Sequence, residues 1–163
     1  MRNTTMIKLL DSNDILTAAN LLSDTWSADE YKCYDRNEEH AIDRIISVVK
    51  NQRSGNLNYV AIKHEVDGEF HGYLLGSVYV DKYGGNLVFN VDDMIVDYKL
   101  GPTSNATTVK HCIDYIIEYC KTHKIPHWRA DSAHSKGQSL AYVKFLNKNY
   151  NGRMLYGFKG EVQ

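Results

Sequence analysis

The sequence predicts a mixed α/β (α+β) fold, in which a central, mostly antiparallel sheet is flanked by helices in the order β-α-α-β-β-β-α-β-α-β. Two observations predict this class. Apolar residues recur at helical spacing in four separate stretches, whereas residues 58–96 contain β-rich runs separated by turn signals. No repeat, linker or low-complexity tract interrupts the 163 residues, so we expect a single domain over residues 1–163.

The first predicted strand is followed by two predicted helices. Ile7–Leu10 is a short apolar run that stops at Asp11–Asp14, a cluster of residue types that commonly cap helices. Apolar side chains then recur with a helical period over Ile15–Trp26 and again over Ala41–Val49. The stretch between the two helices, residues 24–39, is acidic and contains several aromatic side chains.

Three consecutive antiparallel strands are predicted next. Asn58–Val66, Gly72–Val80 and Leu87–Val96 are rich in β-branched and aromatic residues. Asp67-Gly68 separates the first two runs, and Tyr83–Asn86 separates the second from the third. Both separators are typical of hairpin turns, so the three strands are expected to pair in chain order.

A long helix is predicted after these strands. Its apolar stripe runs from Val109 to Cys120, and we expect it to end near His123. Thr103 or Ser104, in the loop that precedes the stripe, is expected to cap its N-terminus.

The remaining elements are a short strand, a helix and a final strand. His127–Ala130 is the short strand, and Gln138–Asn149 has apolar residues available for packing along a helix. Asn151-Gly152 is a turn signal, after which Met154–Phe158 is predicted to form the last strand.

Charge and apolar patterning exclude several classes of partner. Nineteen Lys and Arg residues balance 20 Asp and Glu residues, so the net charge is −1 and no overall positive field is available to hold a nucleic acid. The longest apolar runs are far shorter than the roughly 20 residues of a membrane helix, and the N-terminus lacks the apolar core of a signal peptide. We therefore expect no nucleic-acid or membrane partner and a cytoplasmic location.

The cysteines and histidines do not form a recognisable metal-binding pattern. Cys33, Cys112 and Cys120 are an odd number of cysteines without a CxxC spacing, which is typical of buried free thiols in a reducing compartment. The seven histidines are scattered along the chain without an HExxH spacing, so no metal site is expected.

The junction between the strand that ends at Val96 and the following helix carries a partial motif. Gly101, Ser104 and Ala106 follow at set offsets, and Val109 occupies the apolar helix position beyond them. Together with the element order, this spacing resembles the GNAT superfamily of acyl-CoA-dependent N-acyltransferases, whose loop has the form Arg/Gln-x-x-Gly-x-Gly/Ala. Ala106 fits the last position, whereas Gly101 and Ser104 replace the Arg/Gln and the first Gly, so the chain resembles a divergent member.

The resemblance implies that the chain uses acetyl-CoA as a co-substrate. A diphosphate is held by unpaired backbone N–H groups and by the positive end of a helix, and small residues let the backbone approach. The residues expected to hold the diphosphate are Ser104, Asn105, Ala106, Thr107 and Thr108. The pantetheine arm is expected on the main chain of Met94, Ile95 and Val96, where the fourth strand parts from the fifth. The alternative is that the hydroxyl residues only cap the helix and that the sheet is continuous.

The resemblance also implies positions for the catalytic groups. The base is expected on the fourth strand, at Asp92, with Asp93 as the alternative because a β-bulge would reverse which side chain faces the site. The thiolate donor of the family is a Tyr on the last helix. One alignment puts Phe145 there, which cannot donate a proton. Another, on Gly157-Phe158, leaves Tyr150 or Tyr156 near the site, and Tyr150 is the candidate, with a packing role as the alternative.

The predicted function is therefore transfer of an acetyl group from acetyl-CoA to a primary amine of a small molecule or a protein. The acidic, aromatic stretch 24–39 is expected to attract a cationic amine. The short chain after the last helix implies an open acceptor cleft or one that a second subunit completes in a homodimer. The alternative function is a catalytically inactive GNAT-fold binding or regulatory protein, because Gly101, Ser104 and Phe145 depart from the family pattern.

Overall fold

The computed structural model describes residues 4–28, 37–130 and 136–152. Its elements are β1 (Thr5–Leu9), η1 (Ser12–Asp14), α1 (Ile15–Ala28), α2 (Glu38–Arg53), β2 (Tyr59–Val66), β3 (Glu69–Val80), β4 (Leu87–Val96), η2 (Tyr98–Leu100), α3 (Pro102–Thr122), β5 (His127–Ala130) and α4 (Lys136–Asn149). The predicted strand Met154–Phe158 lies outside the described residues.

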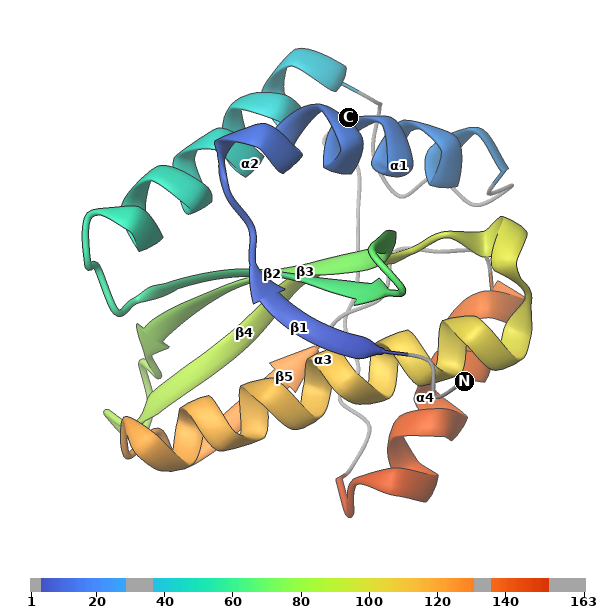
Figure 1. The fold of residues 1–163 in the computed structure, drawn as a ribbon. Helices are drawn as coiled ribbons and strands as arrows, with labels where there is room; N and C mark the ends of the chain where they lie inside the picture. The colour runs from blue at the N-terminus through green and yellow to red at the C-terminus, as the bar shows by residue number, and fades with distance from the viewer. Residues whose placement is uncertain (1–3, 29–36, 131–135, 153–163) are drawn as a thin grey trace, which may run out of the picture.

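The five strands form one mixed sheet in the order β1-β2-β3-β4-β5 (Figure 1). Strands β1 to β4 pair antiparallel with their neighbours, and β5 pairs parallel with β4. Helices α1 and α2 cover one face of the sheet, while α3 and α4 cover the other. The predicted mixed α/β class and the run of three antiparallel strands are confirmed.

Two apolar layers hold the helices on the sheet. The layer under α1 and α2 consists mainly of Leu10, Ala18, Leu22, Ile45, Val49, Ala61, Tyr73, Leu75 and Ile95. The layer under α3 and α4 consists mainly of Val60, Ile62, Leu74, Phe89, Val91, Val109, Cys112, Ile113, Ile116 and Cys120. Alternate residues of β2 and β3 therefore face opposite layers, as expected for strands covered on both faces.

The two described cysteines are buried and unbonded, as expected for structural thiols. Both lie on the inner face of α3. Burial raises the pKa of the Cys112 thiol well above its usual range and raises the pKa of Cys120 to about 11. Cys33 lies outside the described residues.

A β-bulge interrupts the pairing of β3 with β4. Leu75 pairs with Asp93, but the next residue of β3, Gly76, pairs with Val91. Asp92 is therefore the extra residue of β4, and the bulge changes which face its neighbours occupy. Val91 packs in the layer under α3, whereas Ile95 packs in the layer under α1 and α2.

Among the described residues, no helix is long and apolar enough to span a membrane.

Candidate functional site

Helix α3 begins earlier than the sequence predicts. Its N-cap is Gly101, with φ 88° and ψ 168°, and Pro102 is its first residue. Neither Thr103 nor Ser104 caps the helix, because both lie inside its first turn. Proline suits this first position, since its φ is already helical and its missing N–H would have no partner within the helix.

This early start changes which groups at the N-terminus of α3 are available to a phosphate. Asn105 N–H donates to the Gly101 carbonyl at 3.0 Å, and later N–H groups belong to the helix. Within the described part of the chain, the N–H groups of Thr103 and Ser104 are left for a ligand. The expectation that the backbone of residues 105–108 is available is therefore wrong.

Thr108 was expected to bind the diphosphate, but its side chain is buried and is not available to a ligand. It is only 1% exposed, and a 2.9 Å hydrogen bond joins its Oγ1 to Nδ1 of His64. Its side chain faces the sheet, because it lies one helical turn from Ser104 on the inner side of α3. Thr108 therefore seats the helix on the sheet.

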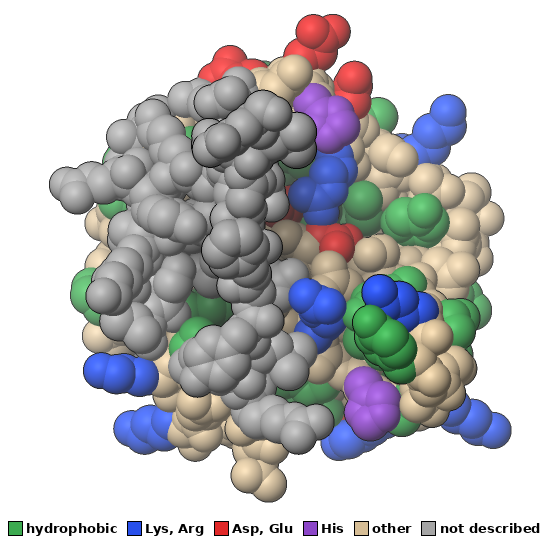
Figure 2. Space-filling view, turned by 180° about the vertical axis from the view of Figure 1, so that it is seen from behind, with side chains coloured by type: hydrophobic (Ala, Val, Ile, Leu, Met, Phe, Trp, Pro, Cys, Tyr) green, Lys and Arg blue, Asp and Glu red, His purple; other side chains and the backbone are tan. Residues whose placement is uncertain are grey.

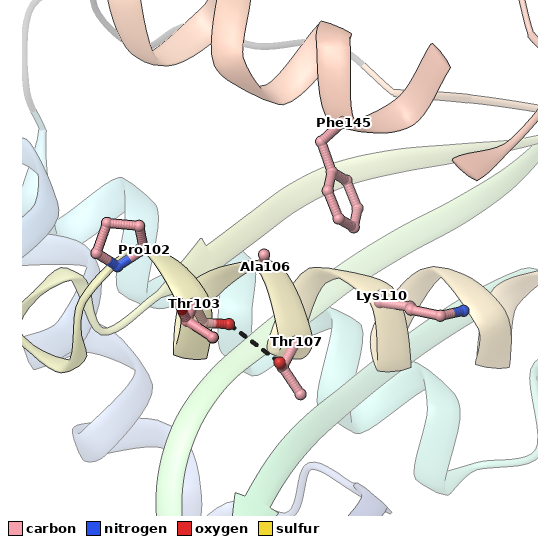
Figure 3. A pocket seen from close by; sticks show the side chains of 6 residues that line it. All are labelled: Pro102, Thr103, Ala106, Thr107, Lys110 and Phe145. Carbon is pink, nitrogen blue, oxygen red and sulfur yellow. Dashed lines mark hydrogen bonds between the residues drawn. The ribbon is translucent and has the colours of Figure 1, made fainter. Parts of the chain in front are cut away.

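An open cavity of about 420 Å³ lies between the first turns of α3 and helix α4 (Figure 3). Its lining residues are Pro102, Thr103, Ala106, Thr107, Lys110 and Phe145. Ala106 and Phe145 point toward each other across it, and the Thr107 hydroxyl donates to the Thr103 carbonyl at 3.0 Å. The cavity thus combines a helix N-terminus, one lysine and a small residue where a chain of phosphates could approach.

Strand β4 keeps β5 as a neighbour over only part of its length. The parallel pairing runs from Val88 with His127 to Val91 with Ala130. Over residues 92–96, which include Met94, Ile95 and Val96, β4 has no β5 partner within the described residues. The backbone on this side of β4, next to the bulge, is where the resemblance implies that the pantetheine arm would bind.

Both candidate base residues lie at the bulge and share one counter-ion, Arg44 on α2. The guanidinium of Arg44 is 2.9 Å from Asp93 Oδ2 and 3.6 Å from Asp92 Oδ2. Asn90, two residues before Asp92 on the same strand, donates its side-chain N–H to Asp92 Oδ1. The bulge therefore directs both carboxylates toward α2, so the choice between Asp92 and Asp93 stays open.

Arg44 is not among the predicted site residues, although its position on the helix indicates that it has a partner across an interface. It stands one residue before Ile45 and four before Val48, both of which are buried against the sheet. A charged residue inside such an apolar stripe indicates a partner across the interface.

The hydroxyl of Tyr73 on β3 adds a polar atom beneath the carboxylates. Tyr73 is fully buried, and its hydroxyl has no hydrogen-bond partner among the described residues. Burial and then the charge of Asp93 raise the pKa of Tyr73, against the opposing effect of Arg44.

Tyr150 has a position between α4 and α3 that fits a packing role. Its hydroxyl donates to Asp114 Oδ1 at 2.8 Å, and its ring meets Trp128 edge-on with 5.9 Å between centroids. Burial and this carboxylate raise the pKa of Tyr150. Its one hydroxyl proton is thus already engaged by α3, which favours the packing alternative over a thiolate donor.

Three histidines from three elements meet beneath α3. His64 on β2 is fully buried, stacks on His111 of α3 at 5.0 Å between centroids, and meets His71 of β3 edge-on at 5.9 Å. A 3.3 Å hydrogen bond joins His71 Nδ1 to Ser104 Oγ. Sequence spacing does not reveal this cluster, because its members come together only when α3 packs on the hairpin.

Acidification is expected to destabilise the protein through His64. Burial, and then the neighbouring His111 and His71, lower the pKa of His64 from 6.5 to about 4. Between pH 6.5 and pH 4 the His64 imidazole is therefore protonated in the unfolded chain and neutral in the folded chain. The free energy of unfolding falls as the pH drops through this range. Between pH 7 and pH 5 the loss is about 2 kcal/mol, measurable by urea denaturation.

Two variants test the source of this pH dependence. His64→Gln should flatten the decline between pH 7 and pH 5, whereas His127→Gln, at an exposed position of β5, should leave it unchanged. An equally steep decline in His64→Gln would contradict the assignment.

Lys and Arg side chains are spread over the face shown in Figure 2, whereas the acidic side chains visible there lie mostly at its upper edge, with one near the centre. Within the described residues, no group of three or more His, Cys, Asp or Glu side chains could hold a metal ion.

The fold is shared with known acetyltransferases. No protein-family profile and no curated protein sequence matches the chain. Among solved structures, it is similar to a ribosomal-protein-alanine N-acetyltransferase from Brucella melitensis biovar Abortus 2308 (TM-score 0.68, 13% identity, 98% of this chain and 100% of that one). It is also similar to the aminoglycoside N-acetyltransferase AAC(6')-Iy in complex with CoA (TM-score 0.71, 10% identity, 99% and 97%). An acetyltransferase from Trypanosoma brucei aligns with TM-score 0.63 and 16% identity, over 98% and 99% of the two chains.

These similarities cover nearly the whole chain at low identity, so they establish the fold. The chain has the fold of the GNAT acetyltransferases, as the element order and the Val96–Val109 motif indicated.

Proposed function

We propose that this protein transfers an acetyl group from acetyl-CoA to a primary amine. The observation that carries the proposal is the placement of three features on this fold. The cavity at the N-terminus of α3, the part of β4 that β5 does not pair, and the two carboxylates at the bulge follow one another from α3 across β4 to α2.

The residues at the N-terminus of α3 fit a diphosphate. The N–H groups of Thr103 and Ser104 point out of the helix end, and Ala106 leaves space beside them. Lys110 lines the same cavity, although its ammonium also pairs with Asp114 at 2.7 Å. Bound there, acetyl-CoA would supply an activated acetyl thioester.

The bulge carboxylates supply the base. An amine attacks only when neutral, so Asp92 or Asp93 takes a proton from the acceptor ammonium directly or through a water. The amine nitrogen then bonds to the acetyl carbon as the carbon–sulfur bond breaks. The nitrogen loses its second proton to water, and the departing thiolate takes a proton from water, so that the neutral amide and CoA are formed. Phe145 cannot donate that proton.

Titration calorimetry with acetyl-CoA and with CoA tests the cofactor half directly, because it needs no acceptor. Micromolar binding is expected. CoA release is then followed with spermidine, an aminoglycoside and a peptide with a free N-terminus as acceptors. Binding without release for any amine would favour a binding protein, and absence of binding at millimolar ligand would contradict the proposal.

Asp92→Asn and Asp93→Asn separate the two candidate bases. Loss of the base should lower kcat/KM by about 10²- to 10⁴-fold, while the affinity for CoA stays the same. Asp43→Asn, at an exposed position on α2, is the matched control and should change neither. Full activity in both bulge variants would remove the carboxylates from the mechanism.

A further inference from the structure

One residue of β3, His71, contacts both ends of the segment that leads from β4 into α3. At the start of this segment, the N–H of Asp97 donates to the His71 carbonyl at 3.0 Å. At its end, a 3.3 Å hydrogen bond joins Nδ1 of His71 to Oγ of Ser104. The main chain of His71 thus holds the exit of β4, and its side chain holds the first turn of α3.

Helix α3 also lies against β3 immediately beside His71. A Cβ at Gly72 would come within 2.8 Å of Thr108 Cγ2, so the missing side chain lets the helix approach this closely. A 2.9 Å hydrogen bond joins Thr108 Oγ1 to Nδ1 of the buried His64. The second turn of α3 is therefore fixed on the sheet, and the bond between Ser104 and His71 extends this attachment to the first turn.

The first turn of α3 is the part of the helix that would contact a diphosphate. Within the described residues, the N–H groups of Thr103 and Ser104 have no partner. Such groups bind an anion more tightly when they are ordered before it arrives, because the ordering then costs no binding free energy.

The hydroxyl of Ser104 gives this turn an attachment point that a glycine would lack. A serine hydroxyl can donate or accept, so the bond with His71 forms whichever ring nitrogen carries the proton. Ser104 stands where the resemblance has a glycine. The contact with His71 therefore gives this departure from the motif a physical role.

We propose that His71 is a positioning residue for the cofactor: through Ser104 it holds the first turn of α3 in the orientation in which the unpaired N–H groups bind a diphosphate. This inference rests on the proposed function. His71 acts through the turn that it orders, and the N–H groups of the turn contact the ligand.

The affinity for CoA, measured by titration calorimetry, tests this role. His71→Leu removes the hydrogen bond and should raise the Kd by about three- to tenfold, the range expected for the loss of one hydrogen bond. His71→Asn places a side-chain amide near the position of Nδ1 and should recover most of the affinity. His127→Leu is the control, because His127 is exposed and pairs with Val88 at the opposite end of β4.

Ser104→Ala removes the same hydrogen bond from its other side and separates positioning from a merely structural role. In this background, His71→Leu should change the Kd by less than about twofold, because the contact is already absent. Equal losses in both backgrounds would overturn the proposal, and so would an unchanged Kd in His71→Leu alone. Thermal unfolding midpoints show whether each variant is folded, and His71→Gln replaces His71→Leu if the latter does not fold.

Hydrogen exchange at the amide of Asn105 provides a second readout that needs no ligand. This N–H closes the first turn by donating to the Gly101 carbonyl at 3.0 Å. His71→Leu should speed its exchange by about three- to tenfold, whereas His71→Asn and His127→Leu should not.

Unchanged exchange at Asn105 in His71→Leu would overturn the positioning role even if the protein binds CoA. If the unmodified protein binds no CoA, the proposed function fails. Faster exchange in His71→Leu would in that case still support the attachment of the turn through His71, so the two failures are distinguishable.

Discussion

Replacing Ala106 by glutamate is expected to weaken the binding of CoA at least 100-fold while the protein stays folded. Ala106 lines the cavity at the start of α3, opposite Phe145. A carboxylate there faces the diphosphate with like charge in a partly dehydrated site, and a 100-fold loss corresponds to about 3 kcal/mol. Near a helix N-terminus a glutamate is itself favourable, so the fold should tolerate it.

Ala106→Gln is the matched control for this variant, because glutamine has nearly the volume of glutamate without its charge. Calorimetry with CoA should show a much smaller loss for glutamine, and both variants should unfold at a similar temperature. Equal losses in the two variants would mean that the cavity rejects bulk rather than charge. Unchanged affinity in Ala106→Glu would place the diphosphate elsewhere.

Replacing Gly72 by alanine is expected to destabilise the protein by about 2–3 kcal/mol. A Cβ at Gly72 would lie 2.5 Å from the Ile95 carbonyl oxygen and 2.8 Å from Thr108 Cγ2. Both neighbours are constrained, since one is backbone of β4 and the other is a buried side chain of α3. The strand pair or the helix must therefore move, which also shifts the first turns of α3.

Urea denaturation measures this loss, and two further variants define its cause. Gly84→Ala is the control, because the nearest atom that its Cβ would meet, at 2.8 Å, is the amide nitrogen of the exposed Asn86 side chain, which can move away. Thr108→Ser keeps the hydroxyl but removes Cγ2, so it should recover part of the stability in the Gly72→Ala background. No recovery would assign the whole effect to the Ile95 carbonyl, and a wild-type stability for Gly72→Ala would contradict the close approach.

The fold was predictable because its signals are local. The hairpin of β2 and β3 follows from Asp67-Gly68, whose two residues have φ angles of 52° and 83°, as a tight turn requires. The start of α3 was predicted too late because the side chains that contact the sheet in its first two turns, Ser104 and Thr108, are polar, so the apolar stripe begins only at Val109. Its first turn, from Pro102, faces the cavity and needs no apolar residues.

The candidate site was predictable only in part. The resemblance places the candidate bases at Asp92 and Asp93 by their spacing from Val96, but the bulge that turns both toward α2 depends on pairing with β3. Arg44 is 49 residues from Asp93 in the chain and meets it only through helix packing. Spacing along one element cannot encode such a contact, and the same is true of the His64 cluster.

Because the two thiols of α3 are buried, a thiol reagent can be used to measure the release of CoA. A thiol reagent attacks the thiolate form of cysteine. Cys112 and Cys120 are buried and have raised pKa values, so they should not react with the reagent in the native protein. Released CoA would then be detected with little contribution from either. Once the protein unfolds, both thiols become reactive, so the reagent that would measure CoA release also reports when α3 has left the sheet.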